Sequence, residues 1–166
     1  MSKNPTMEDV IRQSLIAELD AEALYKHAES ITKNGRTRNI FTQLARDEAG
    51  HFGILRKRYL AMKVAGAEEI KKVVDDKPPS DALKRLEAHL DKDTSERKAL
   101  EIAMGEEQRA VERYELGVKL ADDAQVKKMF EKLVSDEKGH FAILSEEFSI
   151  ISGQPISAEA ETYVRE

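Results

Sequence analysis

Two nine-residue segments of this 166-residue chain are identical at seven positions. Residues 47–55 read Asp-Glu-Ala-Gly-His-Phe-Gly-Ile-Leu, and residues 136–144 read Asp-Glu-Lys-Gly-His-Phe-Ala-Ile-Leu. The copies are 89 positions apart, and the further pairs that share this offset include Glu18 and Glu107, Tyr25 and Tyr114, Phe41 and Phe130, and Leu44 and Leu133. Most other positions differ between the halves, so the repeat indicates two equivalent structural units that preserve a selected set of side chains.

Composition favours long amphipathic helices for these units. The chain is 40% hydrophobic and 36% charged, with only 8 Gly and 4 Pro to interrupt a helix, and no stretch alternates in the manner of a β-strand. The apolar spacing predicts four helices, at about residues 6–34, 37–64, 93–121 and 122–152. Asn34-Gly35 is predicted to cap the C-terminus of the first helix, and Gly153 that of the fourth.

This pattern predicts an all-α, ferritin-like antiparallel four-helix bundle over residues 1–153, made of two helical hairpins joined by a long crossover at about 65–93. A helix of about 27 residues is about 40 Å long, so a crossover of this length can return the chain along the bundle. Residues 154–166 are expected to form a C-terminal tail.

The spacing within the repeat has a chemical meaning. A helix turns by about 100° per residue, so Glu48 and His51 lie on one face, as do Glu137 and His140. Of the four histidines in the chain, only these two follow a glutamate by three positions. Both side chains of each pair can therefore bind one ion, the carboxylate as a hard ligand and the imidazole as a borderline one.

Two more glutamates are expected at the same depth in the bundle. Glu18 and Glu48 lie at similar distances from the first hairpin turn, and Glu107 and Glu137 lie at similar distances from the second. The predicted metal ligands are Glu18, Glu48, His51, Glu107, Glu137 and His140, which match the di-iron carboxylate pattern. Two divalent ions would neutralise the four carboxylates, which would otherwise repel in a buried core. A single Glu-x-x-His pair could instead be a solvated surface pair.

At these residues the sequence resembles the rubrerythrin-like branch of the ferritin-like superfamily, over about residues 10–63 and 96–152. The resemblance implies that the six residues hold two iron ions, with Glu48 and Glu137 bridging them and Glu18 and Glu107 more terminal. It also implies a homodimer. The same hard ligands would accept manganese.

Two features depart from rubrerythrins proper. The chain has no cysteine, so it lacks their rubredoxin-like domain, and an external electron donor would be required. Rubrerythrins also place a second glutamate one turn from the third-helix ligand, where this chain has Met104 and Ala110. Glu22, one turn beyond Glu18, could supply an extra carboxylate, but it has Val111 as its repeat counterpart and is interpreted as a solvated or edge glutamate.

Three further repeat-related pairs are expected to support the site. Tyr25 and Tyr114 could donate a hydrogen bond to a ligand carboxylate on a neighbouring helix, or be ordinary core residues. Asp47 and Asp136 each precede a histidine by about one turn and could accept its free N–H, or lie on the surface. The third pair, Gly50 and Gly139, is expected to let helices approach closely.

These residues leave three functions open: reduction of hydrogen peroxide or oxygen, oxidation and handling of ferrous iron, or a non-enzymatic metal-stabilised interaction module. The resemblance favours the first, a di-iron oxidoreductase. The net charge of −5 argues against nucleic acid as a partner, and no segment is apolar enough for a membrane. The absence of a signal sequence makes the cytoplasm the expected location.

Overall fold

The computed structural model describes residues 5–62, 84 and 95–153. Four helices account for nearly all of this part, and it contains no strand: α1 (Met7–Ile31), α2 (Gly35–Ala61), α5 (Ser95–Leu120) and α6 (Ala124–Ser152). The predicted all-α fold is therefore confirmed. The predicted C-terminal tail lies outside the described residues, as does the crossover apart from Lys84.

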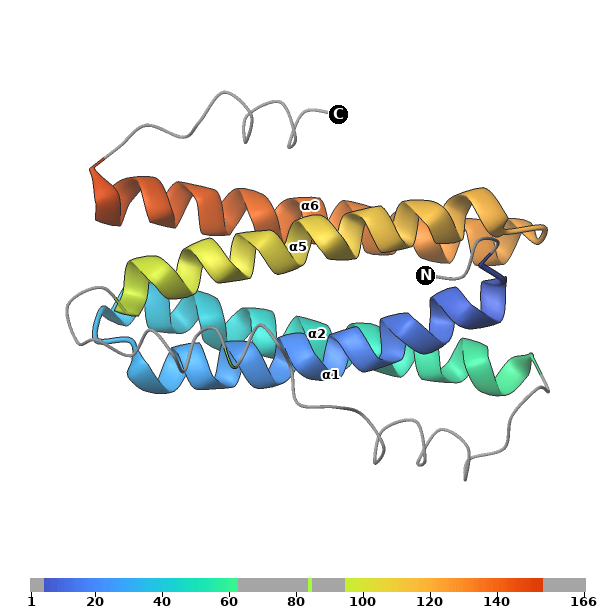
Figure 1. Cartoon of the computed structure of the whole chain (residues 1–166), viewed down its shortest axis with the longest axis horizontal. Helices are drawn as coiled ribbons and strands as arrows, with labels where there is room; N and C mark the ends of the chain where they lie inside the picture. The colour runs from blue at the N-terminus through green and yellow to red at the C-terminus, as the bar shows by residue number, and fades with distance from the viewer. Residues whose placement is uncertain (1–4, 63–83, 85–94, 154–166) are drawn as a thin grey trace.

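The helices form two antiparallel hairpins, α1–α2 and α5–α6, stacked into an elongated bundle (Figure 1). Between the hairpins, α1 packs closely against α5, whereas α2 and α6 approach each other only briefly. The end of α2 and the start of α5 lie at opposite ends of the bundle (Figure 1). This placement of the two hairpins agrees with a ferritin-like topology.

Side chains and one glycine fix the helix ends. Thr6 and Asp9 form a reciprocal capping box at the start of α1, and the Asp123 carboxylate accepts hydrogen bonds from the N–H groups of Gln125 and Val126 in α6. Gly153 ends α6 with φ +66°, a left-handed conformation that glycine adopts without steric strain. The predicted cap at Gly153 is confirmed.

The prediction for Asn34-Gly35 is wrong. α1 already ends at Ile31, and Gly35 is the first residue of α2. The Asn34 side chain accepts hydrogen bonds from the N–H groups of Arg36 and Thr37, so it caps the N-terminus of α2. Asn-Gly is compatible with either role, and the side-chain acceptor decides in favour of the N-cap here.

The core consists of two apolar clusters with a polar layer between them. One cluster lies toward the α1–α2 turn and includes Leu24, Phe41 and Leu100. The other lies toward the α5–α6 turn and includes Ile11 and Phe130. The glutamates and histidines of the repeat occupy the layer between the clusters, so apolar packing encloses them from both ends.

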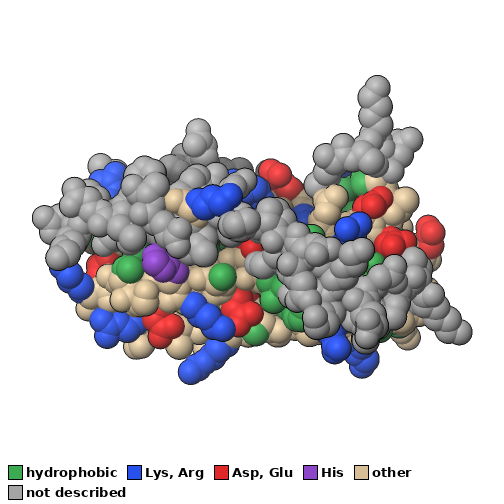
Figure 2. All heavy atoms as spheres, turned by 60° about the horizontal axis from the view of Figure 1, so that its bottom comes forward, with side chains coloured by type: hydrophobic (Ala, Val, Ile, Leu, Met, Phe, Trp, Pro, Cys, Tyr) green, Lys and Arg blue, Asp and Glu red, His purple; other side chains and the backbone are tan. Residues whose placement is uncertain are grey.

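The outer faces of the helices are charged. Figure 2 shows basic and acidic side chains intermixed on one face of the bundle, as expected where helices meet water. None of the helices in the described part combines the length and the apolar character needed to cross a membrane.

Candidate metal centre

The structure brings all six predicted ligand residues together in the middle of the bundle. Glu18 comes from α1, Glu107 from α5, and each of α2 and α6 contributes a Glu-x-x-His pair. The four glutamates are at most 2% exposed, His51 is 5% exposed and His140 is 7% exposed. Since carboxylates are rarely buried without a partner, this layer requires compensating positive charge.

The six residues form two overlapping groups, and within each group one ligand atom per residue lies within 4.8 Å of the others. The first group is Glu18, Glu48, His51 and Glu137, and the second is Glu48, Glu107, Glu137 and His140. Glu48 and Glu137 therefore belong to both groups. Each group offers hard oxygen donors and one imidazole, a set that suits Fe²⁺ or Mn²⁺.

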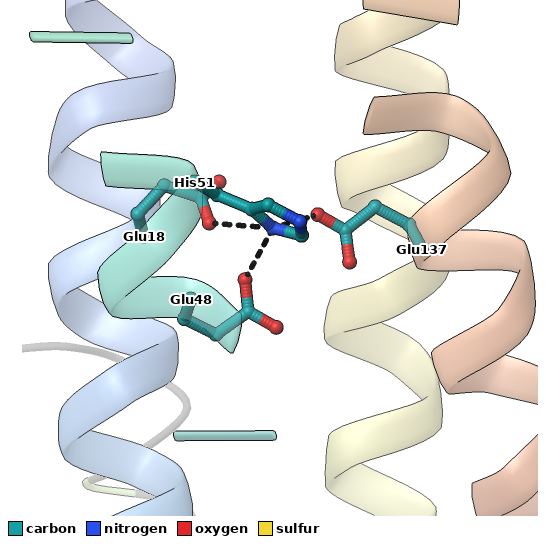
Figure 3. Close-up of side chains that lie close together, drawn as sticks. All are labelled: Glu18, Glu48, His51 and Glu137. Carbon is teal, nitrogen blue, oxygen red and sulfur yellow. Dashed lines mark hydrogen bonds and ion pairs between the residues drawn. The ribbon is translucent and has the colours of Figure 1, made fainter. Parts of the chain in front are cut away.

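Both imidazole rings turn Nδ1 toward the carboxylates. His51 Nδ1 lies 3.1 Å from Glu48 Oε2, 3.1 Å from Glu137 Oε1 and 3.6 Å from Glu18 Oε2 (Figure 3). His140 Nδ1 lies 2.9 Å from Glu137 and 3.2 Å from Glu48. The two rings stack with centroids 5.6 Å apart. Nδ1 is therefore the nitrogen that would bind an ion in each group.

Protons provide the compensating charge in the metal-free protein. Burial disfavours a charged His51, but hydrogen bonds to Glu137, Glu18 and Glu48 outweigh it and raise the His51 pKa to about 12. His140 behaves in the same way, with Glu107 as its largest favourable partner and a strongly raised pKa. The raised pKa values favour the imidazolium form of both rings, which lie where metal cations would bind.

The glutamates divide into two classes. Burial raises the pKa of Glu18 to about 8 and raises that of Glu107 well above its usual range. Burial acts in the same direction on Glu48 and Glu137, but hydrogen bonds from the two histidines outweigh it and lower both pKa values. Glu48 and Glu137, which both groups share, are therefore the charged glutamates. Glu18 and Glu107, which we call the outer glutamates because each belongs to one group, retain protons.

Two buried tyrosines link the repeats. The Tyr25 hydroxyl donates to Glu107, and the Tyr114 hydroxyl donates to Glu18. Burial, reinforced by these neighbouring carboxylates, raises the pKa of each tyrosine well above 10 and keeps it a donor. Each outer glutamate is therefore oriented by a tyrosine from the opposite hairpin. Of the two roles that the sequence left open for these tyrosines, hydrogen bonding to a ligand carboxylate is the one observed.

The rubrerythrin family model matches residues 9–148, which include both hairpins and all six buried residues. The chain belongs to the rubrerythrin family. Among solved structures, a hypothetical protein from Pyrococcus furiosus has the same fold, with a TM-score of 0.70 and 21% identity over 90% of this chain and 92% of that one. No curated protein matches the chain.

In this rubrerythrin-family chain the two aspartates of the repeat face the histidine of the other repeat, not their own. His51 Nε2 lies 3.5 Å from Asp136, and His140 Nε2 lies 3.5 Å from Asp47. The sequence left open whether each aspartate accepts from a histidine on its own helix or lies on the surface, and the structure places each beside the histidine of the other repeat. In each ring Nδ1 points inward and Nε2 points toward the facing helix, which carries the other aspartate.

The expectation for Gly50 and Gly139 is also wrong. A Cβ atom added at either position would meet nothing within 4 Å, so neither glycine permits a close helix approach. The close approach occurs at Gly117, where an added Cβ would lie 2.6 Å from the Phe130 ring. Gly50 and Gly139 instead face open space beside the histidines.

Other polar residues stand apart from the centre. Glu22 pairs with Lys26 at 2.5 Å, in agreement with its interpretation as an edge residue.

The sequence interpretation missed Glu147, which is fully buried near the start of α2, where it accepts a hydrogen bond from the Thr37 hydroxyl and pairs with Arg36 at 2.8 Å. Position 58, its equivalent in the other repeat, is Arg58, so the repeat gave no signal for Glu147.

Proposed function

We propose that this protein is a non-haem di-iron redox protein that reduces hydrogen peroxide or oxygen at the four-Glu, two-His centre. The observation that carries the proposal is the double group itself, in which Glu48 and Glu137 are shared. Two adjacent ions with common ligands suit a two-electron reaction, because each ferrous ion can supply one electron.

The chain's own residues would hold both ions and the surrounding protons. Nδ1 of each histidine and the shared carboxylates would bind the ions, and Glu18 and Glu107 would complete one position each. When bound, the ferrous pair would supply the two electrons that convert one hydrogen peroxide and two protons into two waters. The tyrosine hydroxyls would hold the outer glutamates in place. An external donor would restore the electrons, since the chain has no cysteine.

A second candidate, oxidation and handling of ferrous iron, is favoured by the aspartates beside the histidines. Asp47 is 37% exposed and Asp136 is 28% exposed, and both lie within 3.5 Å of a candidate ligand. Partly exposed carboxylates next to a buried site attract cations. In this function iron would be the substrate as well as the occupant of the site.

The test is to load the metal-free protein anaerobically with ferrous iron and mix it with hydrogen peroxide or oxygen in a stopped-flow instrument. We expect rapid oxidation by peroxide, with one peroxide consumed per pair of ions, and loss of the reaction in Glu48→Ala. Glu22→Ala is the matched control, because Glu22 pairs with Lys26 outside the centre. Faster oxidation by oxygen, with release of ferric iron to an acceptor, would favour iron handling. If neither oxidant reacted with iron-loaded protein, both redox functions would be excluded.

A further inference from the structure

A groove of about 420 Å³ lies between α2 and α6, directly over the two histidines. Its lining follows the internal repeat: each helix contributes a histidine, the glycine before it and the isoleucine three positions after it. These residues are Gly50, His51 and Ile54 on α2, and Gly139, His140 and Ile143 on α6. The groove therefore presents equivalent surroundings to both halves of the candidate centre.

The groove is an opening toward the buried ligands. His51 and His140, which line it, are the most exposed of the six candidate ligand residues, at 5% and 7%, whereas the glutamates are at most 2% exposed. This opening coincides with a weak helix contact, since α2 and α6 approach each other only briefly. A molecule that reached the candidate ions by this route would first meet the histidine side of the centre.

Gly50 and Gly139 keep this space open. Glycine within a helix destabilises it by about 0.5–1 kcal/mol relative to alanine, so two glycines here need a structural reason. Packing gives none, because an added Cβ would meet no atom within 4 Å at either position. A larger side chain would project into the groove. The glycines therefore set the width of the groove rather than the distance between helices.

The rim of the groove carries both apolar and charged side chains, since Arg46, Lys132 and the two aspartates line it beside the two isoleucines. Ile54 is 43% exposed and Ile143 is 48% exposed, and they are two of the three large hydrophobic side chains that are exposed in the described part of the chain. Asp47 and Asp136 are tethered along their own helices, by Gln43 at 2.9 Å and Lys132 at 2.5 Å. The groove thus combines a polar floor at the histidines with two exposed isoleucines on a rim that also carries charged side chains.

We propose that this groove is the substrate entrance of the centre, and that it admits a hydroperoxide carrying a small apolar group. A water molecule takes up about 30 Å³ of liquid, so hydrogen peroxide alone would occupy a small part of the groove. Volumes of about 300–1,000 Å³ are typical of sites for larger organic ligands. The hydroperoxide end would lie at the histidines, and the apolar group would contact Ile54 and Ile143.

The inference rests on the proposed redox function. In the reaction the O–O bond of R–O–OH breaks. Two electrons, one from each ferrous ion, and two protons from solvent convert it into R–OH and water. The external donor that the proposed function requires then reduces the ions again. The inference adds to the proposed function the class of substrate, an organic hydroperoxide, which the groove would select.

The experiment compares cumene hydroperoxide with hydrogen peroxide as oxidants of the ferrous-loaded protein. In Gly50→Leu and Gly139→Leu, added side chains would fill the groove, and we expect oxidation by cumene hydroperoxide to slow about ten-fold or more, a loss of about 1.4 kcal/mol in transition-state stabilisation. Hydrogen peroxide uses the same entrance but needs less space, so it should slow clearly less than cumene hydroperoxide, and the ratio of the two rates is the readout. Gly53→Leu is the matched control, because Gly53 is also on α2, exposed and free of contacts but does not line the groove.

A second readout needs no metal. The unreactive alcohol 2-phenylpropan-2-ol should shift the NMR signals of His51 and His140 in the metal-free protein, and Gly139→Leu should abolish the shift while Gly53→Leu keeps it. Three outcomes would overturn this inference and leave the proposed redox function standing. They are equal slowing of both oxidants in the leucine variants, no slowing of either oxidant, and histidine signals that the alcohol leaves unchanged. If neither oxidant reacts with wild-type protein that has bound iron, the proposed function fails and the inference fails with it.

Discussion

At the scale of single residues, the centre is balanced by protons when metal is absent. His51 and His140 carry raised pKa values, and so do Glu18 and Glu107, whereas Glu48 and Glu137 remain carboxylates. The two imidazolium charges therefore offset two carboxylate charges. Two divalent ions on four ionised glutamates and two neutral histidines would give the same neutral balance, so ions and protons compete for one set of atoms.

Metal binding should accordingly release protons. Two divalent ions bound at pH 7 should displace up to four protons, one each from His51, His140, Glu18 and Glu107. The pKa values of all four groups are raised, so at lower pH more protons occupy the ligand atoms and compete with the ions. The apparent metal affinity should therefore fall as the pH falls from 8 to 6. Calorimetry in buffers of different ionisation enthalpy measures the protons directly. A binding enthalpy that is the same in all buffers would contradict this balance.

The tyrosines should be energetically equivalent. Tyr25→Phe and Tyr114→Phe each remove the donor to one buried outer glutamate, and we expect each to lower the free energy of unfolding by about 1–3 kcal/mol. Equilibrium unfolding in urea measures this for the metal-free protein. Because the internal repeat relates the two sites, the losses should be similar, and a loss confined to one variant would show that the halves have diverged in function.

At the scale of the helices, two glycines near the helix ends should respond oppositely to alanine. Gly35 is helical and has open space around it, so Gly35→Ala should stabilise the protein by about 0.5–1 kcal/mol. Gly153 has φ +66°, so Gly153→Ala should destabilise it by about 1–2 kcal/mol. Thermal unfolding distinguishes the two. Destabilisation by Gly35→Ala would restore the interpretation of Asn34-Gly35 as a C-terminal cap.

The contact between α5 and α6 depends on Gly117. Gly117→Ala would place a Cβ 2.6 Å from the Phe130 ring, and we expect a loss of about 1–3 kcal/mol in the free energy of unfolding. Gly53→Ala, on an open helix surface, is the control and should be neutral or stabilising. Urea unfolding of both variants tests this. A stable Gly117→Ala variant would mean that Phe130 can rotate away without loss of packing.

At the scale of the whole molecule, the sequence predicts the bundle and the composition of the centre. Helical spacing within each repeat places Glu48 with His51 and Glu137 with His140, and hairpin depth adds Glu18 and Glu107. These relations depend only on helix geometry and turn position. Sequence spacing therefore predicts which residues share one layer of the bundle.

The contacts that sequence reasoning misassigned lie between helices. The spacing of Asp47 and His51 suggested a pair, but the side chains meet partners on the facing helix instead. Likewise, Gly50 and Gly139 could either allow two helices to pack closely or leave a groove open. The rotation of α2 relative to α6 decides which of these two roles they have. Periodicity along one helix carries no information about that rotation. Interhelical partners therefore required the three-dimensional structure.

The central claim is that one chain binds two ions that share Glu48 and Glu137. The most direct measurement is an anaerobic titration of the metal-free protein with ferrous iron, counting tightly bound ions per chain. We predict two ions in the wild type, weakened binding of both in Glu48→Ala or Glu137→Ala, and loss of one in Glu18→Ala or Glu107→Ala. Zero or one ion in the wild type, or two ions retained in Glu48→Ala, would contradict the claim.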